Sequence, residues 1–300
     1  MHFSELNNSD ILVTGASGFI GSALSTELVK LGARVHGVSR SSKEFNENVQ
    51  WHQGDLTDLS YVDQLIESVR PDYVFHLAGH VVGRRDVQQV IPSLKNNLLT
   101  TVNLLVSLEK YKCKRMVLAG SLEEPVFGDK VLEASSPYAV SKFAASNYSK
   151  MFHQLYQFPV TIAKIFMVYG PGVRDLKKLL PYVILTAANG NVPELTSGTR
   201  KLDWIYIDDI VSGLIHLAIA PGIDGQTIDI GTGKLTSTRD IVELTVKLMN
   251  PDIKSHFGAV EDRVMEQERR ANSQETFDKI SWKAKIDLES GLKKLINSLV

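Results

Sequence analysis

One stretch of sequence indicates the fold of this chain: Ile11-Leu12-Val13-Thr14-Gly15-Ala16-Ser17-Gly18-Phe19-Ile20-Gly21. Its apolar start predicts a strand, its glycines predict a tight turn, and the helical pattern that follows runs to Leu31. Gly15 would permit the turn, Gly18 a close approach of backbone to a pyrophosphate, and Gly21 close packing of helix on strand. The spacing is G-x-x-G-x-x-G, whereas the standard dinucleotide fingerprint is G-x-G-x-x-G. A purely structural glycine turn is the alternative.

The second expected strand, Arg34–Val38, ends at Ser39 and Arg40. Chains that bind NAD usually carry an acidic residue at this point, and this sequence has none there. The guanidinium of Arg40 could instead pair with the 2′-phosphate of NADP, because its planar fork matches a phosphate group. The sequence therefore favours NADP as the cofactor, with NAD as the alternative. Arg40 could also be an ordinary exposed arginine.

The composition of the 300 residues bounds the class of protein. A hydrophobic content of 43% is enough for a large core, and 33 basic against 34 acidic residues leave a net charge of −1. This balance gives no bulk attraction to nucleic acid or to an anionic membrane. The single cysteine, Cys113, excludes an intrachain disulfide and a thiolate metal cluster, and we expect no metal site. Without a signal-peptide pattern or a long apolar run, we expect a cytoplasmic protein.

Strand-like runs alternate with helical stretches along the first half of the chain. After the first two, these runs are Val49–His52, Tyr73–Leu77, Arg115–Ala119 and Val160–Ile165. The alternation predicts an α/β fold, a Rossmann-type doubly wound parallel sheet with ligand sites at the carboxyl ends of its strands. We expect residues 1–170 to form the dinucleotide-binding domain, with 203–232 returning to it. Residues 171–202 and 233–300 would form a smaller C-terminal substrate-binding lobe.

Tyr138 and Lys142 are separated by one helical turn in the pentapeptide Tyr138-Ala139-Val140-Ser141-Lys142. Ser136 and Pro137 precede them as the expected N-cap and first helical residue, which places both side chains on one face. An ammonium near a phenol favours the phenolate, so we expect Lys142 to lower the pKa of Tyr138. For an isolated pair, the alternative is a half-buried tyrosine above a solvated lysine.

Two long segments, 93–111 and 137–156, are predicted helices whose apolar faces are too broad for one sheet to cover. We expect these faces to pair in a homodimer. Burial within a single chain is the alternative.

With these motifs in order, the chain resembles the extended short-chain dehydrogenase/reductases, in particular their NAD(P)-dependent nucleotide-sugar epimerase/dehydratase/reductase group. The resemblance runs from end to end. It rests on seven motifs: Thr14–Gly21, His76–Gly79, Asn97 before Thr101, Tyr138 with Lys142, Val168–Gly172, Tyr206–Asp209 and Asp229–Gly233.

The resemblance implies roles for individual residues. Tyr138 would be the proton donor or base, Lys142 would hold the nicotinamide ribose, and Ser121 would hydrogen-bond the reacting oxygen. Asp55 would meet the adenine, although it could otherwise be a helix cap. The expected cofactor-binding residues are Gly15, Ser17, Gly18, Phe19, Ile20, Gly21, Ser39, Arg40, Asp55, Leu56, Leu77, Ala78, Gly79, Asn97, Tyr138 and Lys142.

Four residues are expected to contact a nucleotide-sugar substrate: Met167, Arg174, Lys178 and Arg263. Arg263 stands where this family often places an arginine on the substrate diphosphate, and Arg174 and Lys178 are further phosphate candidates. Solvated surface cations are the alternative for all three. Met167 replaces an asparagine that many relatives have, which argues against a simple copy of UDP-galactose 4-epimerase specificity.

The reaction depends on the triplet Ser121-Leu122-Glu123. Sugar 4,6-dehydratases of this family carry Thr-Asp-Glu or Thr-Ser-Glu there, and Leu122 cannot donate a proton. Glu123 is a catalytic candidate, with a solvated loop carboxylate beside Glu124 as the alternative. Our leading hypothesis is NADPH-dependent reduction of a nucleotide-activated keto-sugar. The alternatives are a 4-epimerase or 4,6-dehydratase that recycles its cofactor internally, and a non-catalytic dinucleotide-binding protein.

Overall fold

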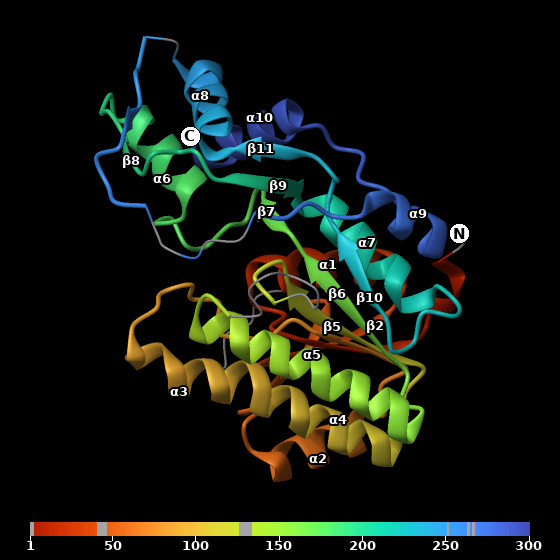
Figure 1. The fold of residues 1–300 in the computed structure, drawn as a ribbon. Coiled ribbons are helices and arrows are strands. Elements are labelled where there is room, and N and C mark those ends of the chain that lie inside the picture. Colours follow the sequence, from red (N-terminus) through yellow and green to blue (C-terminus); the bar gives the residue numbers. More distant parts are fainter. Residues whose placement is uncertain (1–2, 41–46, 126–133, 251, 263–264, 266–267) are drawn as a thin grey trace.

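The computed structural model describes residues 3–40, 47–125, 134–250, 252–262, 265 and 268–300. Its centre is a seven-stranded sheet with the order β10-β6-β5-β4-β1-β2-β3, in which every pairing is parallel (Figure 1). The strands are β1 (Asp10–Thr14), β2 (Arg34–Ser39), β3 (Val49–Gln53), β4 (Tyr73–His76), β5 (Arg115–Ser121), β6 (Val160–Ile165) and β10 (Thr227–Ile230). The strand order reverses between β1 and β4, and ligands of such sheets bind at that switch point.

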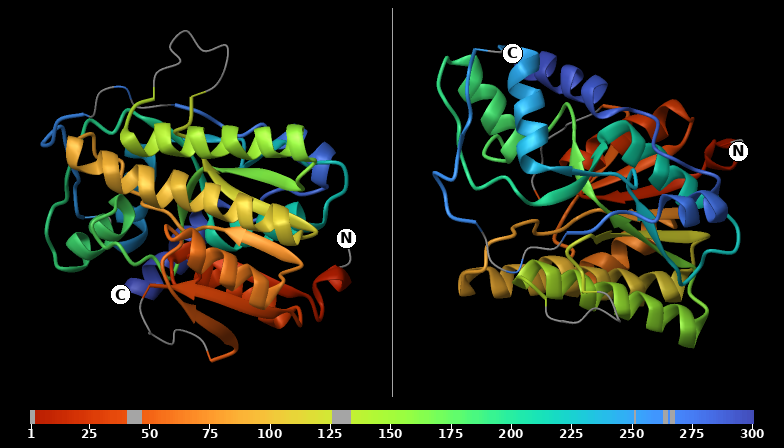
Figure 2. Two further views of the ribbon diagram at one scale, coloured as in Figure 1. Left: turned by 90° about the horizontal axis from the view of Figure 1, so that it is seen from below. Right: turned by 45° about the horizontal axis from the view of Figure 1, so that its top comes forward.

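Helices cover both faces of this sheet, as Figures 1 and 2 show. One face carries α1 (Phe19–Lys30) and α7 (Ile207–Ile219), which contact each other. The other face carries α2 (Leu59–Val69), α4 (Thr100–Tyr111) and α5 (Pro137–Tyr156). The expected doubly wound α/β sheet is therefore confirmed. All seven positions of β5 are buried, as is usual for a central parallel strand.

A smaller layer lies beyond the carboxyl ends of the central strands. The chain leaves the large sheet at Ile165, and its next strand, β7 (Met167–Tyr169), belongs to a three-stranded sheet with β9 (Lys201–Tyr206) and β11 (Leu235–Ser237). A two-stranded sheet joins β8 (Glu194–Leu195) to β12 (His256–Phe257). The helices of this layer are α6 (Leu179–Ala188), α8 (Thr238–Met249) and α10 (Leu288–Leu299), while α9 (Ser273–Ile280) packs beside β10.

The helix expected over residues 93–111 contains a π-helical segment. It starts as α3 (Val90–Ser93), continues as a π-helix over Leu94–Leu99 and becomes α4 at Thr100. The helix expected over 137–156 is found with the same bounds. Its N-cap is Ser136, whose Oγ accepts a hydrogen bond from the backbone N–H of Ala139 at 3.1 Å, as the sequence predicted.

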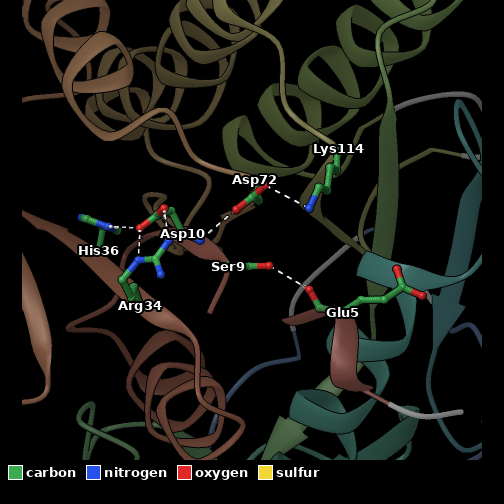
Figure 3. A network of polar contacts seen from close by, with 7 residues as sticks. All are labelled: Glu5, Ser9, Asp10, Arg34, His36, Asp72 and Lys114. Carbon is green, nitrogen blue, oxygen red and sulfur yellow. Dashed lines mark hydrogen bonds and ion pairs between the residues drawn. The ribbon is translucent and has the colours of Figure 1, made fainter. Parts of the chain in front are cut away.

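Charged side chains link the opposite, amino-terminal edge of the large sheet (Figure 3). Arg34 on β2 donates to Asp10 on β1 through Nε at 2.8 Å, and Asp72 accepts from the backbone N–H of Asp10 at 3.0 Å. Lys114, just before β5, is 3.0 Å from the Asp72 carboxylate. These contacts join the amino-terminal ends of β1, β2, β4 and β5, at the edge of the sheet opposite the carboxyl ends.

In the described part of the chain, no helix is long and apolar enough to cross a membrane.

Candidate active site

The glycine-rich turn occupies the switch point of the sheet. Gly15 has a φ of +70°, and a Cβ there would lie 2.7 Å from the backbone nitrogen of Ala78, after β4. A Cβ on Gly21 would lie 2.1 Å from the carbonyl oxygen of Gly15. Gly18 is the N-cap of α1, so the first N–H groups of this helix have no acceptor within it. The backbone thus forms a cradle for a pyrophosphate, which fits a dinucleotide.

Residues of the expected adenosine end lie together at the carboxyl edge. Ser39 ends β2 and pairs in register with Gln53 of β3, and Arg40 beside it is exposed. The exposed carboxylate of Asp55 accepts a hydrogen bond from the N–H of Thr57 at 2.9 Å, and Leu56 is buried. The side chain that caps α2 is that of Asp58, two residues after Leu56.

Ser121, Tyr138 and Lys142 converge where β5 ends beside α5. The Ser121 side chain acts on the Tyr138 phenol and lowers its pKa. The ammonium of Lys142 donates to the carbonyl oxygen of Ala119 at 2.9 Å, and this side chain is buried. A Cβ on Gly79 would lie 3.6 Å from Lys142 Nζ, so the lysine also faces the loop after β4. The three residues predicted for proton transfer are thus brought together.

The electrostatics of Tyr138 differ from the expectation. Burial raises the pKa of Tyr138 to about 12, the hydrogen bond from Ser121 opposes this rise, and the Glu124 and Glu123 charges add to it. Lys142 is not among the groups that set this pKa, so the predicted lowering of the Tyr138 pKa by Lys142 is wrong for this structure. Burial lowers the pKa of Lys142 to about 8. Near neutral pH, Tyr138 therefore carries its proton and is ready to donate it.

Asn97 lies in the π-helical segment and contacts the same carboxyl edge of the sheet. Its Oδ1 accepts from the backbone N–H of His80 at 2.7 Å, and its Nδ2 donates to Ser141 Oγ at 2.8 Å. Asn97 therefore joins the loop after β4 to α5, next to Lys142. Widened helical turns of this kind often occur at functional sites.

Glu123 is engaged in an ion pair. Its Oε1 accepts from the guanidinium of Arg200, just before β9, at 2.9 Å, and its Oε2 accepts from Ser135 Oγ at 3.3 Å. Leu122, between the two catalytic candidates, is buried. Leu122 packs in the hydrophobic core at the position where a Thr-Asp-Glu dehydratase has its acid, and the Glu123 carboxylate is paired with an arginine from the smaller layer.

Sequence reasoning missed the importance of Glu124 and of two arginines. The sequence analysis assigned no role to Glu124, yet this side chain is only 4% exposed, and its Oε1 accepts a hydrogen bond from the backbone N–H of Ser121 at 2.7 Å. Arg269, before α9, donates to the Glu124 carbonyl oxygen at 2.9 Å. Arg200 and Arg269 thus bind the loop after β5 from the other layer. The one signal in the sequence is Gly120, because a glycine inside a strand often marks a close approach of another group. In the structure, a Cβ there would lie 2.8 Å from Glu124 Oε1.

The residues expected at the substrate are spread around the second layer. Met167 on β7 is partly buried and pairs in register with Trp204. Arg174 and Lys178 are exposed on the segment between β7 and α6, where Arg174 lines a small cavity with Ala16 and Trp51. Arg263 lies outside the described residues.

No group of three or more His, Cys, Asp or Glu side chains that could hold a metal ion occurs among the residues the structure describes.

Comparison with known proteins agrees with this geometry. The model of the NAD dependent epimerase/dehydratase family matches residues 11–231, which run from β1 to just beyond β10. The chain belongs to this family. It is thus an enzyme of the extended short-chain dehydrogenase/reductase type, in a family that acts on nucleotide sugars with a nicotinamide dinucleotide, as the sequence motifs implied.

Three similar proteins illustrate the family. A UDP-glucuronate 4-epimerase of Thermodesulfobacterium geofontis is 27% identical, over 95% of this chain and 94% of its own length. A probable dTDP-glucose 4,6-dehydratase of Sinorhizobium fredii is 28% identical, over 95% and 91%. The enzyme WbmF of Bordetella bronchiseptica, solved in complex with NAD+ and UDP, has a TM-score of 0.83 at 26% identity, over 98% and 93%. These names include epimerases and dehydratases, and they support the internal-redox alternative better than the leading hypothesis of net reduction.

Proposed function

We propose that this enzyme oxidises and re-reduces one carbon of a nucleotide-activated sugar, as a 4-epimerase that recycles its own nicotinamide cofactor. The observation that carries the proposal is the convergence of Ser121 at the end of β5 with Tyr138 and the buried Lys142 of α5, at the edge of the sheet that holds the glycine turn. The 4-epimerase among the similar proteins supports the same reaction. Dehydration is less well supported, because Leu122 is apolar and Glu123 is paired with Arg200.

We propose the following roles for the site residues. When bound, the dinucleotide accepts and returns a hydride. Tyr138 exchanges a proton with the reacting sugar oxygen, and Ser121 stabilises charge on that oxygen by a hydrogen bond, an interaction that strengthens as the charge develops. Lys142 orients the cofactor's ribose. The glycine turn binds the pyrophosphate through Gly15, Ser17, Gly18, Phe19, Ile20 and Gly21, and Leu77–Gly79 line the nicotinamide half.

The substrate is proposed to lie between the two layers. On this proposal, residues 1–170 and 203–232 hold the cofactor, and residues 171–202 and 233–300 hold the nucleotide sugar. Met167 would contact the sugar, and Arg174, Lys178 and Arg263 would meet its phosphates. UDP, bound by the similar enzyme from Bordetella, is the first nucleotide to test.

The test is incubation of the purified protein with UDP- and dTDP-sugars. We expect a sugar of inverted configuration to form without added cofactor, and mass spectrometry of the denatured protein to detect a retained dinucleotide. Stoichiometric consumption of added NADPH, with no product in its absence, would contradict internal recycling and favour net reduction of a keto-sugar. A dehydrated keto-sugar product would favour a dehydratase.

Net reduction with NADPH is the second candidate, and two observations favour it. Arg40 is exposed at the carboxyl end of β2, next to Ser39, where a 2′-phosphate would lie. Tyr138 is protonated near neutral pH, as a proton donor to a ketone must be.

Replacing Arg40 with serine tests the choice of dinucleotide. If Arg40 binds a 2′-phosphate, the change should weaken NADPH binding about 10- to 100-fold, because charge-assisted hydrogen bonds contribute about 1.5–3 kcal/mol. NADH binding should stay within about twofold, because NADH has no 2′-phosphate. Isothermal titration calorimetry with both dinucleotides gives the ratio of their dissociation constants. An equal loss of affinity for NADPH and NADH would contradict a role of Arg40 in selecting NADP.

We further propose a homodimer through α3–α4 and α5. Figure 2 shows these helices side by side on one side of the molecule, away from the smaller layer. Their outer surface exposes large apolar side chains, which a partner would cover. These are Val90, Ile91, Leu94, Val106, Val140, Tyr148, Leu155 and Tyr156. Analytical ultracentrifugation should give twice the mass of the chain, and a monomer at micromolar concentration would contradict the proposal.

A further inference from the structure

Glu124 lies directly behind the proposed catalytic pair. Its Oε1 is 2.7 Å from the backbone nitrogen of Ser121, and its own N–H donates to the Ser121 carbonyl oxygen at 3.1 Å. The side chain thus closes a reciprocal turn on Ser121 at the last residue of β5. Gly120 makes room for this turn, because a Cβ there would approach Glu124 Oε1 to 2.8 Å. The orientation of Ser121 therefore depends on the carboxyl group three residues later.

The same carboxylate acts on the buried lysine. Lys142 is 5% exposed, and an ammonium in such a place is costly without an opposite charge nearby. Burial lowers its pKa to about 8, and Glu124 is the group that opposes this by raising it. Lys142 Nζ contacts the neutral carbonyl oxygen of Ala119, and the Glu124 carboxylate lies against Gly120, the next residue along β5. Glu124 is thus the acid at this corner that acts on the Lys142 pKa.

Other titratable groups on α5, β4, β6 and the loop after β5 lie around Glu124 and Lys142. Tyr138 and Lys150 on α5 respond to Glu124, and Lys164 on β6 acts on Lys150. His76 on β4 responds to Lys142, and burial lowers the pKa of His76 to about 3, so this imidazole is neutral. Glu123 acts on Tyr138 and is bound to Arg200. Among these groups, Glu124 alone contacts the Ser121 backbone and also raises the Lys142 pKa.

We propose that Glu124 is a positioning residue of this enzyme: its carboxylate fixes the backbone of Ser121 and supplies the counter-charge of Lys142, which sets both for proton transfer at Tyr138. This inference rests on the proposed catalytic roles of Ser121, Tyr138 and Lys142. It assigns to one buried acid a mechanical and an electrostatic function, which two substitutions separate.

The test compares Glu124→Gln with Glu124→Asp. Glutamine keeps an acceptor at the same reach but removes the charge, so the Lys142 pKa should fall below about 8, by about one unit for a charge pair in partly screened surroundings. The alkaline limb of the kcat–pH profile should move to lower pH by the same amount, since activity is lost where Lys142 loses its proton. Aspartate keeps the charge but loses reach, so kcat should fall about tenfold with an unmoved limb.

A 13C NMR titration of protein that carries 13C-labelled lysine gives the Lys142 pKa without chemical modification and without any turnover. Glu123→Gln is the matched control. It removes the same charge at the neighbouring residue, and Glu123 does not act on the Lys142 pKa. If Glu124→Gln leaves the Lys142 titration unchanged, or if both Glu124 variants fail to fold, the proposal is overturned. A shifted titration in a protein that turns over no nucleotide sugar would instead refute the proposed function and leave the Glu124–Lys142 coupling in place.

Discussion

Tyr138→Phe should lower kcat by about 10²- to 10⁴-fold, the usual contribution of a positioned general acid or base. Phenylalanine keeps the ring on α5 and removes only the hydroxyl, on whose pKa Ser121 acts. KM for the nucleotide sugar should change little, because the lost interaction acts mainly in the transition state. Steady-state kinetics with a nucleotide sugar that the wild type converts measures both quantities.

The control for this variant is binding and stability. Dinucleotide affinity should be retained, and the free energy of unfolding should change by no more than about 1 kcal/mol, the contribution of one hydrogen bond. Turnover within tenfold of the wild type would remove Tyr138 from the mechanism. Absence of turnover in the wild type with every nucleotide sugar tested, together with intact dinucleotide binding, would revive the alternative of a non-catalytic binding protein.

Gly21→Ala should destabilise the fold and weaken dinucleotide binding together. The new Cβ would lie 2.1 Å from the Gly15 carbonyl oxygen and 2.9 Å from the Ala16 Cα, both on backbone that cannot rotate away. Overpacking of this kind costs about 3 kcal/mol or more when the neighbour is rigid. Because relief of the clash must move α1 away from the glycine turn, the pyrophosphate cradle opens as well. Urea unfolding and dinucleotide titration measure the two effects.

Gly190→Ala is the matched control. Gly190 follows α6 with a φ of +74°, and among the described residues nothing lies within 4 Å of the place its Cβ would take. Alanine there should cost only about 1–2 kcal/mol for a left-handed conformation, with dinucleotide binding unchanged. Equal losses in the two variants would mean that close packing of Gly21 on Gly15 has no special part in the site.

The local signals in the sequence predicted the framework well. The bounds of β6 and α5 coincide with the expected ones, and the Ser136 cap has the expected hydrogen bond. Such elements are recognisable because hydrophobic period, capping residues and glycine spacing act over a few neighbouring positions. The expected single helix over 93–111 differs more, since its π-helical turn places Asn97 between His80 and Ser141, which are distant in sequence.

The alternating parallel sheet, the glycine turn and the Tyr138–Lys142 pair could be predicted from the chain alone, because each has a short pattern. Ser121 was added to that pair only through the resemblance to a known family. Their electrostatics came only from the folded arrangement. Folding buries Tyr138 enough to raise its pKa, where the sequence had predicted a lowering by Lys142. It also buries Glu124 behind Ser121 and pairs Glu123 with Arg200, 77 positions away. Desolvation and charge pairing depend on which distant segments exclude water from a group, and no local pattern records that.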